Sequence, residues 1–229
     1  MLSQSFKIVV VLSILLGACS SKKSTTDGSS ESPITTGSVS RELDLKSVDS
    51  LGLEVATLAG GCFWKMDACY QQTKGVVSLA VGYGGGTTVN PTYEQVGTKK
   101  TGHAESIQLI FDPKIISYKE ILDIFWHIHD PTQFDREGND VGNDYRSAVF
   151  YHTERQQKIA ERIKDSLDQS STFKWAIVTE ITPFLNFYKA EAYHQDYYNE
   201  HPYEPYTLNV VRPKVKHFEE EFKGKLKNL

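Results

Sequence analysis

The chain has 229 residues, of which 39% are hydrophobic and 24% charged, and this leaves room for one globular core of about 150 to 200 residues. Its formal net charge of −4 is spread along the chain without a basic run, so a nucleic acid is not expected as a partner. Three cysteines are too few for the dense disulfide framework of a small secreted scaffold.

Residues 1–18 have the pattern of a signal peptide. An apolar run over residues 8–18 follows Lys7 and is too short to span a bilayer. The run ends in Leu16-Gly17-Ala18-Cys19, which resembles the bacterial lipobox, where a peptidase cuts before a cysteine that then carries lipid. The alternative is an ordinary secretory signal that happens to contain a cysteine. We expect Cys19 to be lipidated, and the protein to be anchored to a bacterial membrane on its extracytoplasmic side.

Residues 19–50 predict a flexible tether behind the lipidated cysteine. They are rich in Ser, Thr, Gly, Lys and Asp and contain almost no aromatic residue. Such a segment cannot bury enough apolar surface to offset the entropy lost on ordering. The folded domain is therefore expected over residues 51–229.

The first half of this domain predicts strands and helices around a single cysteine. Residues 54–59 predict a short strand, Gly60-Gly61 a tight turn, and residues 63–72 a helix that begins directly after Cys62. Residues 76–83 are rich in β-branched side chains and predict a buried strand, which a run of glycines ends.

The second half continues in mixed order. Residues 105–111 alternate polar and apolar side chains as a strand does, and Ser117 with Glu120 forms a capping box for a helix over residues 121–130. The remaining elements are expected as strands over 147–151 and 176–181 and helices over 154–167, capped by Thr153 with Gln156, 188–200 and 214–227. This order favours an α/β fold of the α+β two-layer sandwich type, with a single mixed β-sheet packed with helices in a ferredoxin-like arrangement.

Cys62 is the candidate reactive group. It stands at the start of a predicted helix, where the positive end of the macrodipole lowers the pKa of a thiol. From the residues alone, a buried structural thiol is an equal alternative. The adjacent Phe63 and Trp64 fit both readings, since aromatic residues at a helix start usually belong to the core.

The segment Gly60-Gly61-Cys62-Phe63-Trp64 resembles the signature of the peptide methionine sulfoxide reductase A family. Further blocks match this family in order and spacing. They are GYGGG at 82–86, NPTY at 90–93, TGHAE at 101–105, HDPTQ at 129–133, GND at 138–140, YRS at 145–147, AYHQ at 192–195 and NEHPY at 199–203. A chance agreement over so many ordered blocks is not expected.

The resemblance implies an enzyme, a peptide-methionine (S)-S-oxide reductase. It would reduce methionine S-sulfoxide, in proteins, in peptides or as the free amino acid, and so repair oxidised proteins. Cys62 would attack the sulfoxide sulfur and become a sulfenic acid as methionine leaves. Glu105 occupies the position of the family's acid, and its pKa should be raised by an apolar surround.

The resemblance also assigns the residues around the sulfoxide. Tyr93 and Tyr145 match tyrosines that hydrogen-bond the sulfoxide oxygen, and Asp140 matches an acidic residue that orders water and polar groups beside them. Phe63 and Trp64 would form the apolar wall for the S-methyl group. Without the family pattern, the two tyrosines would pass as surface loop residues and Glu105 as a solvated strand residue.

The sequence departs from the family pattern at several positions. Lys65 stands where the family often has a small residue. It could favour the Cys62 thiolate, but we expect it to point into water. Asp67 stands where the family usually has Glu, and no catalytic role is assigned to it. Thr207 stands where many members have a resolving cysteine. Cys69 is expected to be a core residue, with a local rearrangement that makes it the resolving thiol as the alternative.

Neither a cofactor nor a metal is expected. His127 and His129 are two residues apart on a predicted helix and face different ways, while His103 and His194 lie in family blocks and are expected to be structural. An external thiol or a thioredoxin-like partner would reduce the Cys62 sulfenic acid. The other partners expected are oxidised methionine and the membrane that holds the lipid, and the protein is expected to be a monomer.

Two other function classes remain compatible with the residues. A Cys-based peroxidase would use the same activated thiol but would reduce hydroperoxides. A non-catalytic lipoprotein would use the fold to bind exposed methionine.

Overall fold

The structure is a computed structural model that describes residues 45–227. The predicted signal peptide, Cys19 and most of the predicted tether lie outside the described residues. The last residues of the predicted tether are helical, as α1 (Leu45–Val48) followed by the 3-10 turn η1 (Asp49–Leu51). Val48 is buried, so the prediction of a flexible segment is wrong for residues 45–50.

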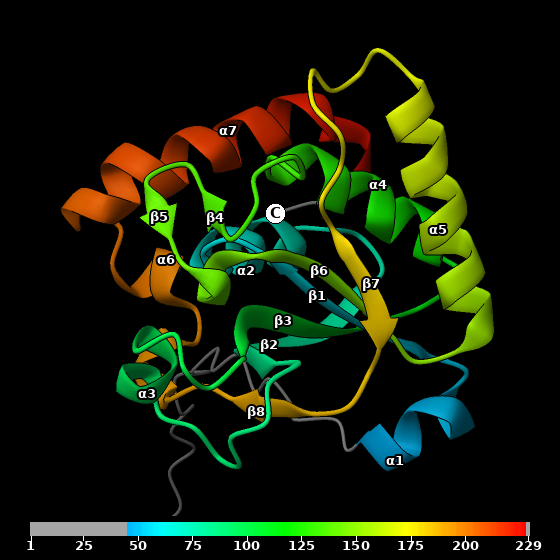
Figure 1. Cartoon of the computed structure of the whole chain (residues 1–229). Coiled ribbons are helices and arrows are strands. Elements are labelled where there is room, and N and C mark those ends of the chain that lie inside the picture. Colours follow the sequence, from blue (N-terminus) through cyan, green and yellow to red (C-terminus); the bar gives the residue numbers. More distant parts are fainter. Residues whose placement is uncertain (1–44, 228–229) are drawn as a thin grey trace, which may run out of the picture. The chain divides into compact units, whose positions relative to one another are not determined.

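A six-stranded mixed sheet forms the centre of the fold, in the order β7-β6-β1-β3-β2-β8 (Figure 1). Its strands are β1 (Glu54–Gly60), β2 (Val76–Gly84), β3 (Ala104–Phe111), β6 (Ser147–Tyr151), β7 (Glu180–Pro183) and β8 (Phe187–Lys189). All neighbours are antiparallel except the parallel pair of β6 and β7. A separate small sheet, β4 (Arg136–Glu137) with β5 (Asp140–Val141), was not expected.

The inner strands give the ferredoxin-like arrangement that the sequence predicted. Helix α2 (Phe63–Gln71) follows β1 and helix α4 (Tyr118–Ile128) follows β3, so that the order β-α-β-β-α-β places β6, β1, β3 and β2 side by side. Helix α2 packs on the sheet and against α7 (Arg212–Glu221), and α4 packs on the sheet and against α5 (Glu154–Gln169) and α7 (Figure 1). The predicted mixed α/β fold is therefore confirmed.

Helix α4 shows how local sequence and burial act together. Ser117 accepts a hydrogen bond from the amide of Glu120, whose carboxylate accepts one from the amide of Ser117, as the predicted capping box requires. The inward face of the helix buries Ile121, Phe125 and Trp126 in the core. Thr153 caps α5 by accepting from the amide of Gln156, while the Gln156 side chain accepts from the amide of His152 and not from that of Thr153.

The chain after α5 differs most from the prediction. The strand expected over 176–181 lies at β7 instead, because the amide of Ile177 is bonded to the side chain of Asp168 and that of Val178 to the carbonyl of Pro131. The helix expected over 188–200 is replaced by β8, the 3-10 turn η3 (Ala192–His194) and the short helix α6 (Tyr197–Glu200). The first residues of this range pair with β2 and form β8 instead of a helix. Asp196 has φ +57°, which interrupts a helix before α6.

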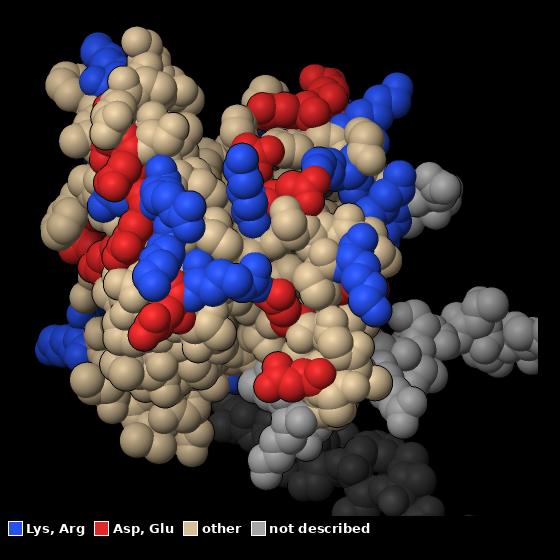
Figure 2. Space-filling view, turned by 90° about the vertical axis from the view of Figure 1, so that its right-hand side faces the viewer, with Lys and Arg blue, Asp and Glu red and all other residues tan. Residues whose placement is uncertain are grey.

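The remaining elements are α3 (Tyr93–Gly97), η2 (Asn143–Tyr145), the π-helical turn η4 (Thr207–Val211) and η5 (Lys223–Lys225). No helix between residues 45 and 227 is long and apolar enough to cross a membrane. Basic and acidic side chains are interspersed on the face that Figure 2 shows, which is the pattern of a mixed surface and not of a basic field.

Candidate active site

Cys62 occupies the turn between β1 and α2, where it is the N-cap residue of the helix. Its side chain is 8% exposed, so the thiol is nearly enclosed by the protein. Gly61 has φ +78°, and a Cβ on it would lie 2.4 Å from Cγ of Glu137. The turn therefore requires glycine both for its backbone conformation and for the close approach of Glu137.

The pKa of the Cys62 thiol is raised, contrary to the prediction from the helix start. Burial and then the nearby Glu105 carboxylate raise this pKa to about 12, while hydrogen bonds with Tyr206 and the Trp64 amide lower it less. The amide at the helix start thus acts in the predicted direction. It is outweighed because burial removes the water that would solvate the thiolate.

Glu105 projects from β3 to the start of α2. Its Oε2 accepts a hydrogen bond from the amide of Phe63 at 3.1 Å, and its side chain is buried. Burial, with smaller contributions from Asp144 and Asp140, raises the pKa of Glu105 to about 8 against the opposing effect of the Phe63 amide. The predicted raised pKa is confirmed, and the carboxyl is mostly protonated at neutral pH.

Three tyrosine hydroxyls gather beside these groups. Tyr93 and Tyr145 hydrogen-bond each other, and Tyr206 donates to Oδ2 of Asp140 at 2.6 Å. Burial and the Glu105 carboxylate raise the pKa of Tyr93 to about 12, and the same two causes raise the pKa of Tyr145. Burial and the nearby Cys62 raise the pKa of Tyr206. All three phenols are therefore protonated, and hence available as donors, at neutral pH.

Tyr206 also hydrogen-bonds the Cys62 sulfur and was not predicted. A phenol has one proton: Tyr206 donates it to Asp140, whereas donation to the Cys62 sulfur is what lowers the pKa of the thiol. The Tyr206 hydroxyl thus lies between Cys62 and Asp140 and can donate to either of them. No sequence signal singled out Tyr206 among twelve tyrosines, except its place directly before Thr207.

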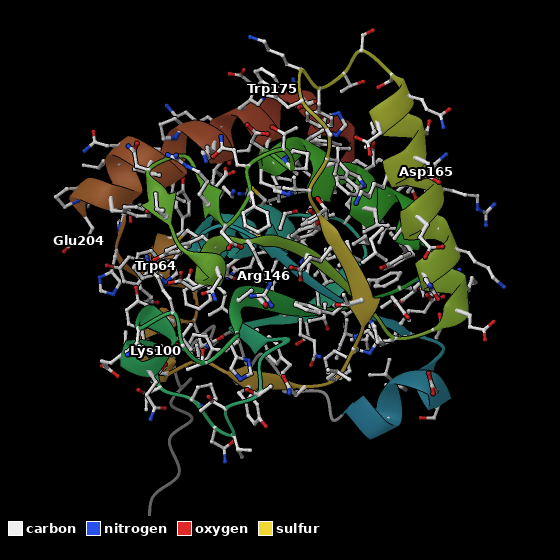
Figure 3. The ribbon with its side chains drawn as sticks, in the orientation of Figure 1. Trp64, Lys100, Arg146, Asp165, Trp175 and Glu204 are labelled. Carbon is white, nitrogen blue, oxygen red and sulfur yellow. The ribbon has the colours of Figure 1, made fainter. Side chains whose placement is uncertain are left out.

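Aromatic rings form the apolar side of the site. Trp64 is half-buried and stacks on Tyr197 with 3.7 Å between ring centroids, while Phe63 is fully buried behind it. His194 fixes the indole by accepting a hydrogen bond from Nε1 of Trp64 at 3.2 Å. Trp64 lies on the side of the molecule where α6 and α3 are found, well away from Trp175 (Figure 3).

Glu191 is a further unpredicted residue of the site. Its Oε1 accepts from the amide of Tyr93 at 2.9 Å, and its Oε2 accepts from the hydroxyl of Tyr83 at 2.7 Å. The carboxylate therefore ties the start of α3 to β2. This contact holds the backbone of Tyr93 in place beside the site.

Lys65 and Asp67 both point inward. Lys65 is 2% exposed and donates to the carbonyl of Gly60 at 2.9 Å, so the expectation that it points into water is wrong. Asp67 is buried and accepts from Nε2 of Gln71 at 2.9 Å and from the amide of Asp196 at 3.2 Å. Burial raises the pKa of Asp67 to about 7, and its contacts tie α2 to the turn before α6.

Cys69 and Thr207 lie in the interior. Both are fully buried, and the two cysteines among residues 45–227 are free thiols. Burial raises the pKa of Cys69 to about 12, and the Thr73 hydroxyl bonds its carbonyl. Cys69 is thus a core residue, as predicted.

The histidines divide as the spacing predicted. His127 is exposed whereas His129 is buried, with its ring bonded to the Phe125 carbonyl and the Ser147 hydroxyl. His103 accepts from the amide of Gly86 through Nδ1. In the described part of the chain, no cluster of three or more His, Cys, Asp or Glu residues could hold a metal ion.

Comparison with known proteins adds an independent line of evidence. Residues 54–226 match the family model described as peptide methionine sulfoxide reductase. The peptide methionine sulfoxide reductase MsrA of Saccharolobus solfataricus is 53% identical over 175 residues, which cover 76% of this chain and 98% of the relative. The protein of the same name from Thermus thermophilus is 44% identical over 174 residues, with 76% and 98% covered.

Two solved structures agree with these matches. Mxr1 from Saccharomyces cerevisiae in reduced form superposes with a TM-score of 0.63 at 35% identity, over 67% of this chain and 88% of that one. Methionine sulfoxide reductase A of Corynebacterium diphtheriae gives a TM-score of 0.60 at 34% identity, over 67% and 78%.

Proposed function

The chain belongs to the peptide methionine sulfoxide reductase family and reduces methionine sulfoxide in protein repair, and we propose that Cys62 is its nucleophile. The observation that carries the proposal is the Glu105 carboxyl, which the Phe63 amide holds beside the nucleophile turn at 3.1 Å. A carboxyl with a pKa of about 8 keeps its proton at neutral pH and can give it to an oxygen atom.

The proposed reaction transfers the oxygen atom of methionine sulfoxide to the sulfur of Cys62. Cys62 attacks the sulfoxide sulfur while Glu105 gives its proton to the sulfoxide oxygen. The S–O bond to methionine breaks and the bond between the Cys62 sulfur and oxygen forms, so the products are methionine and a Cys62 sulfenic acid. The proton lost by the Cys62 thiol passes to Glu105 and restores its carboxyl, so protons balance.

Tyr93 and Tyr145 are proposed to bind the sulfoxide oxygen. Their protonated hydroxyls lie together beside Glu105. A sulfoxide oxygen bound there can accept a hydrogen bond from each of them. Trp64, backed by Phe63, is proposed to receive the S-methyl group. Donors on one side of the sulfur and an apolar wall on the other select one configuration, which we propose to be the S epimer.

We propose that an external thiol or a thioredoxin-like protein reduces the sulfenic acid directly, without a cofactor. Cys69 is fully buried in α2 and Thr207 replaces a possible resolving thiol, so the described residues offer Cys62 no ready partner for a disulfide. A single turnover without reductant should therefore leave one oxygen atom on Cys62, with one methionine released per chain.

Mass spectrometry of the peptides that contain Cys62 and Cys69 tests this step. The matched control is Cys69→Ala, which should release the same one methionine and carry the same added oxygen. A disulfide between Cys62 and Cys69, seen as the loss of two hydrogens, would contradict direct reduction by an external thiol.

We further propose that residues 1–18 are a signal peptide, that Cys19 carries lipid, and that the chain works as a monomer on the extracytoplasmic side of a bacterial membrane. The support is the lipobox-like segment at the end of a short apolar run. Cell fractionation tests it: the wild-type chain should sediment with membranes and Cys19→Ala should not. Equal membrane fractions for both proteins would contradict the anchor.

A further inference from the structure

A buried cluster of charged groups lies behind the turn that carries Cys62. Lys65 of α2 donates to Oε1 of Glu137 at 3.1 Å, and Lys214 of α7 reaches the same oxygen at 2.5 Å. The other oxygen of Glu137 accepts from the amide of Asp130 at 3.0 Å. Both oxygens of this buried carboxylate thus accept hydrogen bonds. Lys65 is also buried, with 2% of the residue exposed.

The cluster touches the backbone of the nucleophile turn at two points. Lys65 donates to the carbonyl of Gly60 at 2.9 Å, and Gly61 packs directly on the Glu137 side chain. On the far side of the turn, a Cβ on Gly60 would lie 3.1 Å from the Phe125 ring. The turn is therefore held between the charged cluster and the core, with no space on either side.

The charges in the cluster are complementary. Burial raises the pKa of Glu137, but Lys65 and Lys214 outweigh burial and hold it at about 2. Burial lowers the pKa of Lys65, and attraction to Glu137 and, more weakly, to Cys62 opposes this. Attraction is mutual, so a charged Lys65 also stabilises a Cys62 thiolate.

Three other titratable groups face the cluster. His129 is neutral at neutral pH because burial lowers its pKa to about 4. Asp130 interacts electrostatically with Glu137, and Cys69 with Lys65.

We infer that Lys65 is a positioning residue of the reaction. Its ammonium, held by Glu137, fixes the Gly60 carbonyl and with it the position of Cys62, and it supplies the positive charge that offsets the thiolate while the thiolate attacks. The charge comes from inside the fold and not from the substrate side, so it is present before the substrate binds. The inference rests on the proposed role of Cys62 as nucleophile.

The test compares three variants of the full protein with the wild type. Lys65→Met removes the ammonium at nearly constant length and leaves Glu137 paired with Lys214. The double variant Lys65→Met/Glu137→Gln removes the carboxylate as well, so that neither charge of the buried Lys65–Glu137 pair remains. Lys119→Met, at an exposed lysine in the first turn of α4, is the matched control.

The measurements are kcat and KM for a methionine sulfoxide peptide, and the rate of Cys62 alkylation by iodoacetamide as a function of pH. Both Lys65 variants should lower kcat by about tenfold to a hundredfold with little change in KM, since the misplaced group is the nucleophile and not the binding wall. Their alkylation should also require a higher pH. The control should match the wild type in both measurements.

A folded double variant with wild-type kcat and a wild-type alkylation profile would overturn the inference. A purely structural role of Lys65 predicts that result, with only the urea midpoint lowered. If Lys65→Met alone fails to fold, the double variant decides. Failure of the proposed function is separate, because it would appear as turnover that persists in Cys62→Ser with Lys65 intact.

Discussion

The resting Cys62 thiol should react slowly with alkylating reagents at neutral pH. An ordinary thiol with a pKa of 9.0 has a thiolate fraction of ~10⁻² at pH 7, whereas a pKa of about 12 gives ~10⁻⁵. Cys62 should therefore react about a thousandfold more slowly with iodoacetamide than the same thiol in the unfolded chain, apart from any loss by restricted access. Its rate should still rise between pH 9 and pH 10, where an ordinary thiol levels off.

Substitution of Glu105 by Gln separates reactivity toward an alkylating reagent from turnover. The Glu105 carboxylate raises the pKa of Cys62, and this carboxyl ionises as the pH rises through about 8. Glu105→Gln should therefore be alkylated faster than the wild type at pH 9 and equally fast at pH 6, although it loses the proton donor for turnover. Asp165→Asn, at an exposed position on α5 (Figure 3), is the matched control and should follow the wild type.

The assay is the second-order alkylation rate of Cys62, followed by mass spectrometry from pH 6 to pH 10. A wild-type rate at pH 7 close to that of the unfolded chain would refute the reasoning, because burial could not then be raising the pKa of the Cys62 thiol. Alkylation of Glu105→Gln that is no faster than wild type at pH 9 would refute the contribution of the carboxylate.

Three further predictions concern the acid, the turn and the core. Turnover at saturating reductant should fall as the pH rises through about 8, because Glu105 loses the proton it donates, and Glu105→Gln should lower kcat by about 10²-fold or more; a flat pH profile to pH 10 would argue against this acid. Gly61→Ala should lower the free energy of unfolding in urea by about 1 to 3 kcal/mol, because its Cβ would meet Glu137 at 2.4 Å; unchanged stability would show that the turn can relax. Met66→Ala should lower it by about 2 to 5 kcal/mol, because the side chain is fully buried; a change below 1 kcal/mol, on the order of a surface substitution, would contradict that burial.

The parts of the fold predicted correctly are those fixed by local signals. Ser117 with Glu120 and Thr153 with Gln156 cap their helices through contacts three residues apart, so the sequence alone contains both partners. The turn at Gly60-Gly61 is equally local. Runs of apolar residues predict the inner strands. The order of strands and helices along the chain predicts how these strands are arranged in the sheet.

The parts predicted wrongly depend on contacts between distant residues. The local pattern of residues 188–200 predicts a helix, but pairing with β2 decides the conformation of Tyr188 and Lys189. The orientation of Lys65 depends on Glu137, which lies 72 residues further along the chain. The pKa of Cys62 depends on how completely other segments cover it, and no local pattern reports burial from distant segments.

The candidate site divides in the same way. The family resemblance brought Cys62, Glu105, Tyr93, Tyr145 and Asp140 forward, and the structure places them around one thiol. It did not bring forward Tyr206 or Glu191. Their contacts join segments that are 66 and 98 residues apart in the chain, so only the folded structure reveals them.

The most direct test of the account is the turnover of the two separated epimers of a methionine sulfoxide peptide, with dithiothreitol as reductant, by the purified protein and by Cys62→Ser. The wild type should reduce the S epimer alone, and Cys62→Ser should reduce neither. Reduction of the R epimer, turnover of neither epimer by the wild type, or turnover that persists in Cys62→Ser would contradict it.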